Sequence, residues 1–156
     1  MADNQTALLI KEWERARAGA EEFITAMPDE KLSFRPVPEV LSFAGQFLHI
    51  AEANYLFASA AFGVESPYKG KNAEENPELE AKPALLEFVL ASYAFIATNI
   101  PSLSSDALAE DVNLFKLRMP RHLIFSKALE HHAHHRGQTA VCFRLHGLKP
   151  PSKRLF

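Results

Sequence analysis

Residues 120–146 read PRHLIFSKALEHHAHHRGQTAVCFRLH. We expect one long helix that begins at Pro120 and ends at His146. Gly147 is typical of the position just after a helix, and Pro150 lies just beyond it. Four of the seven histidines of the chain lie between positions 131 and 135, inside this expected helix.

Three earlier segments also have the pattern of helices. In the first, Thr6 to Met27, apolar residues recur every three or four positions and form one stripe. The second runs from Ser42, a candidate N-cap, to Phe62. The third begins near Pro83, because proline suits the first helical turn, and ends at Pro101.

The connections differ in character. Asp29 to Val40 holds prolines and has no helical period, so it is expected to be a loop. Gly63 to Lys82 is polar and is expected to be a long, exposed connection. Pro101 to Met119 is ambiguous, and Asp106 to Leu114 is either a short helix or a turn. No segment alternates apolar and polar residues well enough to predict a strand.

These elements predict an all-α protein, a four-helix bundle with a long loop between the second and third helices and a short extra helix or turn before the fourth. The chain has 156 residues, so we expect residues 1–156 to form a single domain. Trp13, Cys142 and the twelve phenylalanines are expected in the core, and His122 and His146 on the surface.

Composition excludes several classes of protein. Lysine and arginine number 17 and aspartate and glutamate 19, a net charge of −2, which does not support nucleic-acid binding. The single cysteine excludes an internal disulfide framework and a cysteine-rich zinc module. Met1 to Gly19 is charged where a signal peptide would be apolar, and Phe88 to Ser105 is too polar to span a membrane. We therefore expect a cytoplasmic protein without a membrane partner.

The histidine run has the geometry of a metal site. At about 100° per residue, His135 lies only about 40° from His131 on the helix surface, and both are expected to face the bundle interior. His132 and His134 are expected to flank that face. Two imidazoles at positions i and i+4 can bind one cation, as they do in helical zinc motifs. The alternative is a solvated face, because unpaired buried imidazoles would cost about 1–3 kcal/mol each.

His49, on the second helix, is a candidate third ligand. Small residues share its face and would let another helix approach closely; they are Ser42, Gly45, Ala53 and Ala60. Glu52 lies about 60° from that face. Its carboxylate could accept the second ring N–H of a ligand histidine or contact a bound water, which makes it a weak catalytic candidate. The alternative is an ordinary histidine satisfied by a hydrogen bond.

Several motifs resemble those of the DinB-like family. The segment 131–138, HHAHHRGQ, followed by Phe-Arg-Leu at 143–145 and Gly-Leu-Lys-Pro-Pro at 147–151, is similar to the family's C-terminal signature. FLHIAE at 47–52 resembles its second-helix histidine motif, and LSFRP at 32–36 its preceding loop. His132 departs from the acidic residue that is common at its position in relatives.

The resemblance implies a four-helix bundle, often a homodimer, with a divalent metal on His49, His131 and His135. Three nitrogen ligands leave zinc or nickel with an open position for a small-molecule substrate. Some relatives are transferases of a low-molecular-weight thiol such as bacillithiol or mycothiol. We therefore expect a metal-dependent enzyme of this kind; the alternatives are a metal-dependent hydrolase and a non-catalytic, stress-associated metal-binding dimer.

Overall fold

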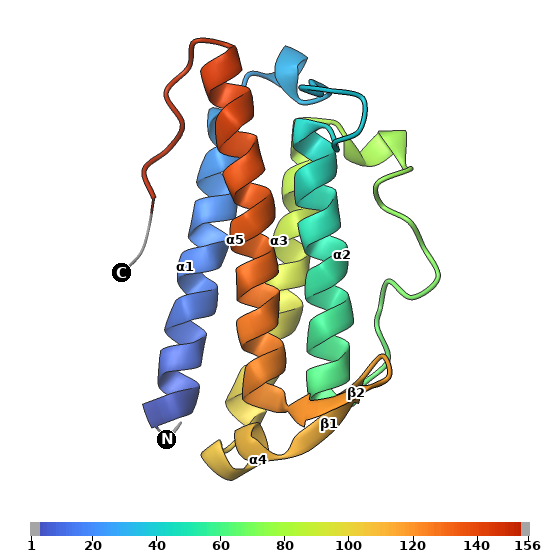
Figure 1. Cartoon of the computed structure of the whole chain (residues 1–156), viewed down its shortest axis with the longest axis vertical. Coiled ribbons are helices and arrows are strands. Elements are labelled where there is room, and N and C mark those ends of the chain that lie inside the picture. The colour runs from blue at the N-terminus through green and yellow to red at the C-terminus, as the bar shows by residue number, and fades with distance from the viewer. Residues whose placement is uncertain (1–3, 154–156) are drawn as a thin grey trace.

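The computed structural model describes residues 4–153, and four long helices lie side by side in it (Figure 1). They are α1 (Asn4–Ala26), α2 (Phe43–Phe62), α3 (Lys82–Asn99) and α5 (Arg121–Leu145). The expected helical class is confirmed, and each long helix begins and ends within about two residues of its expected bounds, an ordinary uncertainty for helix termini.

The helix ends follow from local chemistry. The hydroxyl of Ser42 accepts a hydrogen bond from the backbone N–H of Gly45 at 3.0 Å, which satisfies one free donor at the start of α2. Gly63 ends α2 in the left-handed conformation, with φ of 68°. Gly147 has φ of 69° just after α5, the conformation expected of a residue that stops a helix.

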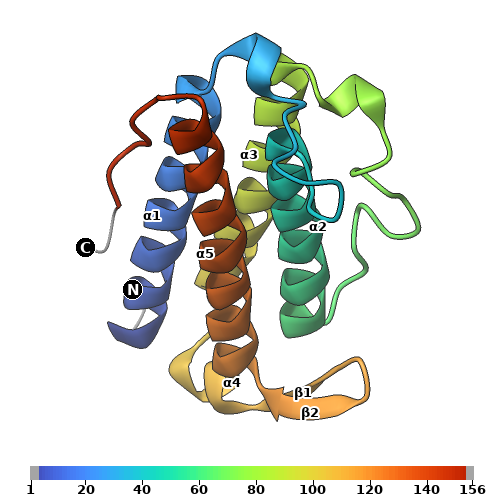
Figure 2. The same cartoon turned by 45° about the horizontal axis from the view of Figure 1, so that its top comes forward.

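The core lies between the four long helices. Helix α2 packs against α3 and α5, and α1 packs against the same two helices from the other side (Figure 2). Trp13 is buried edge-on against Tyr93 and Phe125, with ring centroids 6.1 and 6.4 Å away. Trp13 and Cys142 are buried as expected, but Phe115 is 74% exposed, so the expectation that every phenylalanine is in the core is wrong.

A β-hairpin was not expected from the sequence. Strand β1 (Asp111–Leu114) pairs with antiparallel β2 (Leu117–Pro120), with Asp111 opposite Pro120 and Leu114 opposite Leu117. The strands are four residues each, too short for a clear alternation, and their two-residue turn has no glycine. The short helix α4 (Ser105–Ala109) precedes the hairpin, so a short helix and a strand share the segment that was ambiguous.

Arg121 holds the base of this hairpin against the bundle. Its guanidinium donates to the carbonyls of Ala61 and Ala107, each at 2.8 Å, and pairs with the carboxylate of Glu110 at 2.6 Å. These bonds join the end of α2, helix α4 and the start of α5. The hairpin is therefore fixed near the lower ends of α2 and α5 in Figure 1.

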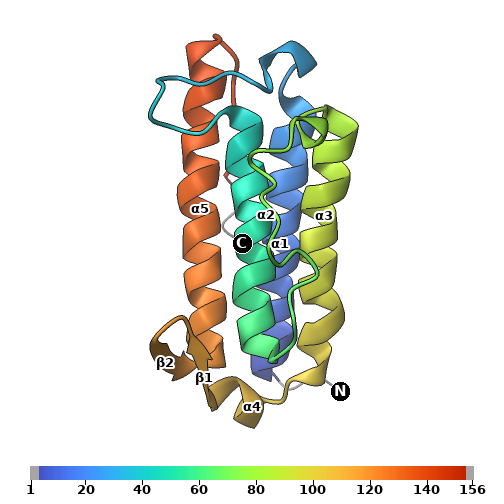
Figure 3. The same ribbon diagram turned by 90° about the vertical axis from the view of Figure 1, so that its right-hand side faces the viewer.

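The segment between α2 and α3, residues 63–81, runs along the outside of α2 (Figure 3). It contains one short 3₁₀ turn, η2 (Pro77–Leu79); two others are η1 (Asp29–Lys31) and η3 (Ile100–Ser102). The stretch Lys82–Ser102 is long and apolar enough to cross a membrane by length and composition alone. In this fold Leu85, Val89 and Ile96 of this stretch are buried in the bundle.

Candidate metal centre

Three imidazoles from two helices converge at the α2–α5 seam. His49 comes from α2, and His131 and His135 come from successive turns of α5. One ring nitrogen of each lies within 4.8 Å of the other two, and the ring centroids are 4.4–4.9 Å apart. The spacing expected from the sequence therefore brings these three side chains together.

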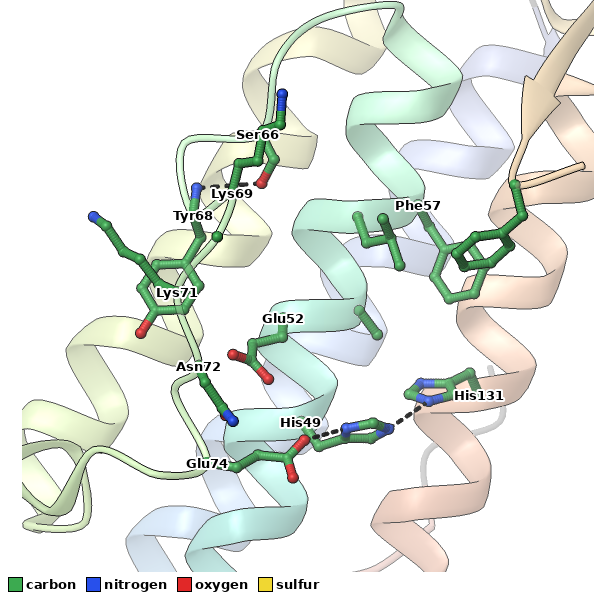
Figure 4. Close-up of a pocket in the computed structure, with 14 residues that line it drawn as sticks. His49, Glu52, Phe57, Ser66, Tyr68, Lys69, Lys71, Asn72, Glu74 and His131 are labelled. Carbon is green, nitrogen blue, oxygen red and sulfur yellow. Dashed lines mark hydrogen bonds and ion pairs between the residues drawn. The ribbon is translucent and has the colours of Figure 1, made fainter.

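The nitrogen positions match the size of a transition-metal ion. The Nε2 atoms of His49 and His131 lie 3.0 Å apart (Figure 4). Two nitrogens that bind zinc at 2.0–2.1 Å in tetrahedral geometry would lie about 3.3 Å apart. A shift of a few tenths of an ångström would therefore accommodate an ion between the two rings.

Hydrogen bonds fix the tautomer of His135. Its Nδ1–H donates to the side-chain carbonyl of Gln46 at 2.6 Å, which leaves the Nε2 lone pair free for a metal. The amide of Gln46 donates in turn to Gln138 at 3.0 Å, and Gln138 donates to Nε2 of His134 at 2.9 Å. Gln46 is only 2% exposed, so the acceptor that orients the partly exposed ring of His135 is itself held inside the bundle.

His49 is oriented by a carboxylate. Its Nδ1–H donates to Glu74, which lies in the segment 63–81, so its Nε2 also points to the shared centre (Figure 4). The expectation that Glu52 could accept this ring proton is wrong, because Glu52 instead accepts the backbone N–H of Ala73. Glu74 was not predicted from the sequence, because the segment around it has no helical periodicity and no recognisable motif.

Burial keeps two of the three imidazoles neutral. Burial, with the nearby His49 and His134, lowers the pKa of His131 to about 4. Burial, with the nearby His131, His49 and His134, likewise lowers the pKa of His135 to about 4. Neutral imidazole is the form that binds metal, so both rings are ready ligands at neutral pH.

His132, not His131 or His135, points into the centre of the bundle. It is 2% exposed and its ring meets Tyr93 at 5.9 Å, whereas His131 and His135 are partly exposed in the α2–α5 seam. The expected orientation was wrong because α5 packs against both α1 and α2. Two sides of α5 therefore face a neighbouring helix, and the spacing along α5 does not tell which of them faces the centre of the bundle. His122 is exposed as expected, but His146 is partly covered and packs on Phe34 at 4.3 Å.

A cavity of about 650 Å³ adjoins the histidines, and we call it the metal-side pocket. Its polar wall comes from His49 and His131 together with Glu52, Glu74, Lys69 and Lys71. Burial, with the neighbouring carboxylate of Glu74, raises the pKa of Glu52 despite its hydrogen bond from Ala73. Within residues 4–153, the other potential ligand group is His49 with Glu52 and Glu74, which shares His49 with the triad.

Fold and site together define a class: a helical bundle with three histidines between two of its helices. The model of the DinB family matches residues 1–155, and the chain belongs to this family. No curated protein matches the chain.

Solved structures of three other bacterial proteins share the fold. A DinB-like protein from Bacillus cereus is similar with a TM-score of 0.80 and 20% identity, over 94% of this chain and 95% of that one. A DinB-like protein from Bacillus subtilis gives 0.72 and 18%, over 93% and 96%. A conserved protein from Enterococcus faecalis gives 0.68 and 20%, over 93% and 97%.

Proposed function

We propose that His49, His131 and His135 bind one divalent transition metal, zinc or nickel. The observation that carries this proposal is the convergence of three ring nitrogens within 4.8 Å, two of them on rings held neutral by burial. An all-nitrogen donor set suits zinc, nickel and their neighbours, while magnesium and calcium prefer oxygen. Gln46 and Glu74 support the fit, because each accepts the far N–H of a ligand ring.

We propose further that the site belongs to an enzyme that transfers a low-molecular-weight thiol. A metal with an open position would supply Lewis acidity, which keeps a bound thiol deprotonated at neutral pH. The metal-side pocket gives a small molecule access to His49 and His131. Cys142 is buried, and burial raises the pKa of its thiol, so the protein's own cysteine is a poor nucleophile.

The residues of the chain have distinct roles in this proposal. Glu52 lies in the pocket with a raised pKa, so its carboxylate is a candidate acceptor for the thiol proton. Lys71 lines the same pocket and offers positive charge to an anionic group of the thiol, whereas Lys69, which also lines it, is paired with Glu65 at 3.1 Å. The sulfur then forms a bond to an electrophilic carbon, and the leaving group departs with the electron pair.

The test uses metal-loaded protein with bacillithiol or mycothiol and a chromogenic electrophile. His49→Ala and His135→Ala should each lose the bound metal and the turnover together. His122→Ala is the matched control, because His122 is an exposed histidine on α5, the helix that carries His135, and it is not part of the triad. Turnover that survives both ligand substitutions would refute the proposed mechanism.

The second candidate function is a structural metal site, and one observation supports it. The triad links α2 to α5, so a bound ion would add directly to the free energy of unfolding. Chelation separates the two functions. If chelation abolishes turnover while the fold persists, the site is catalytic; if it sharply lowers the melting temperature and no thiol, ester or amide substrate reacts, the site is structural.

We propose a homodimer, because the family resemblance implies one, and a cytoplasmic location, because the composition of the sequence favours one. Sedimentation of the purified protein tests the dimer, and a monomer at micromolar concentration would contradict it.

A further inference from the structure

A second cavity also borders His131 and is lined by side chains of the β-hairpin. It has a volume of about 540 Å³ and is formed in part by Phe57, Phe115, Leu117, Met119, Leu123 and His131. We call it the hairpin groove. It shares Phe57, Phe115 and His131 with the metal-side pocket, so both cavities border the same candidate metal ligand.

The chemistry of the hairpin groove differs from that of the metal-side pocket. Its walls are mainly apolar side chains of β1, β2, α2 and α5. Its charged members, Lys127 and Glu130, pair with each other at 2.7 Å, so neither requires a counter-charge from a ligand. The groove therefore suits an uncharged, apolar molecule, and its volume is typical of a small-molecule site.

Phe115 is the residue that most clearly indicates a ligand. It occupies the hairpin turn with φ of 56°, a conformation that a two-residue turn normally assigns to glycine, and its ring is 74% exposed. A bulky residue in this conformation is uncommon, and strained residues cluster at ligand sites. Phe115 contributes little to the core, yet it lines both cavities.

We infer that the hairpin groove binds the apolar carbon electrophile that the thiol attacks, with Phe115 as a specificity-determining contact. The inference rests on the proposed thiol transfer: the thiol enters through the metal-side pocket and the electrophile through the groove. For an organic halide, the sulfur–carbon bond forms as the carbon–halogen bond breaks. The halide leaves with the bonding electrons, and the thiol proton passes to Glu52 or to water.

The first experiment measures binding without turnover. N-phenyl-1-naphthylamine, an uncharged apolar fluorophore, is titrated into zinc-loaded protein. Phe115→Gly, which suits the turn, and Leu117→Ser should each raise its Kd about tenfold or more, as expected for lost apolar contacts. Leu145→Ser is the control, because Leu145 is 59% exposed, close to the 61% of Leu117, at the far end of α5. A Kd that is unchanged by both groove substitutions would overturn the inference.

Two further measurements complete the test. Loading with Co²⁺ should quench the bound fluorophore, because the groove ends at His131; unquenched emission would place the probe elsewhere and refute the inference. Sedimentation covers the case of a second copy of the chain. If the wild type is a dimer that Leu117→Ser converts to a monomer, the groove is an interface and the inference fails.

A turnover assay separates this inference from the proposed function. With bacillithiol as the thiol, Phe115→Gly should raise KM for 1-chloro-2,4-dinitrobenzene and leave KM for the polar electrophile iodoacetamide unchanged. An equal rise for both electrophiles would overturn the assignment of specificity to Phe115. If the fluorophore responds to the groove substitutions but no electrophile reacts with any thiol, the apolar site stands and the proposed thiol transfer fails.

Discussion

Gln46 offers the sharpest test of how the histidines are held. Its side chain is 2% exposed and accepts the Nδ1–H of His135 at 2.6 Å, which fixes the tautomer that turns Nε2 to the centre. Gln46→Leu keeps the volume but removes the acceptor. The ring is then free to rotate or to change tautomer, and its buried N–H loses its partner.

The expected loss follows from the role of such outer partners. Removing one typically weakens metal binding by about 10- to 100-fold. This corresponds to about 1.4 to 2.8 kcal/mol of binding free energy. The assay is a competition for zinc between the protein and a chromogenic chelator at pH 7.5. Circular dichroism of the same samples confirms that the variant is folded.

Gln138→Ala is the matched control for Gln46→Leu. Gln138 bonds to Gln46 at 3.0 Å and to His134 at 2.9 Å, one step further from the ligand ring. Its removal should weaken zinc binding much less than Gln46→Leu does. Unchanged zinc affinity in Gln46→Leu, or a larger loss in Gln138→Ala, would refute the orientation argument.

Three further predictions concern the same framework. In metal-free protein, the pKa values of His131 and His135 are about 4 in the folded state and 6.5 in the unfolded state, so the unfolded chain binds more protons between these two pH values. The free energy of unfolding should therefore fall as the pH drops from 6.5 toward 4. A free energy of unfolding that stays constant over this range in urea titrations would contradict the prediction. Glu74→Ala, which removes the acceptor for the His49 N–H, should weaken zinc binding about tenfold or more without loss of helicity, and equal chelator competition with the wild type would count against it. Ser42→Ala should lower the free energy of unfolding by about 1 kcal/mol through the lost N-cap, measured by thermal melts, with Ser126→Ala as an exposed control.

The sequence predicted the parts of the site that depend on helical spacing. His131 and His135 are one helical turn apart on α5, and His49 faces them from a stretch of small residues on α2. Gln46 lies three residues before His49, so the two residues are neighbours on the surface of α2. This spacing was sufficient to predict that Gln46 lies near the three histidines.

What the sequence could not predict depends on how helices and loops are placed. Helical angles relate residues on one helix, but they do not say which side meets which neighbour, so His132 was wrongly expected at the flank of the inward face. Glu74 reaches His49 from an aperiodic segment, and only the path of the chain shows the contact. The turn at Phe115 carries no glycine, so the hairpin had no local signal.

Anomalous X-ray diffraction from crystals of zinc-loaded protein would locate the ion itself and so decide whether the three histidines bind it. One strong peak is expected at about 2.0–2.1 Å from a ring nitrogen of each of His49, His131 and His135, with the remaining coordination filled by water or a small molecule. A peak elsewhere, or an ion enclosed by four protein ligands, would refute the proposed metal centre.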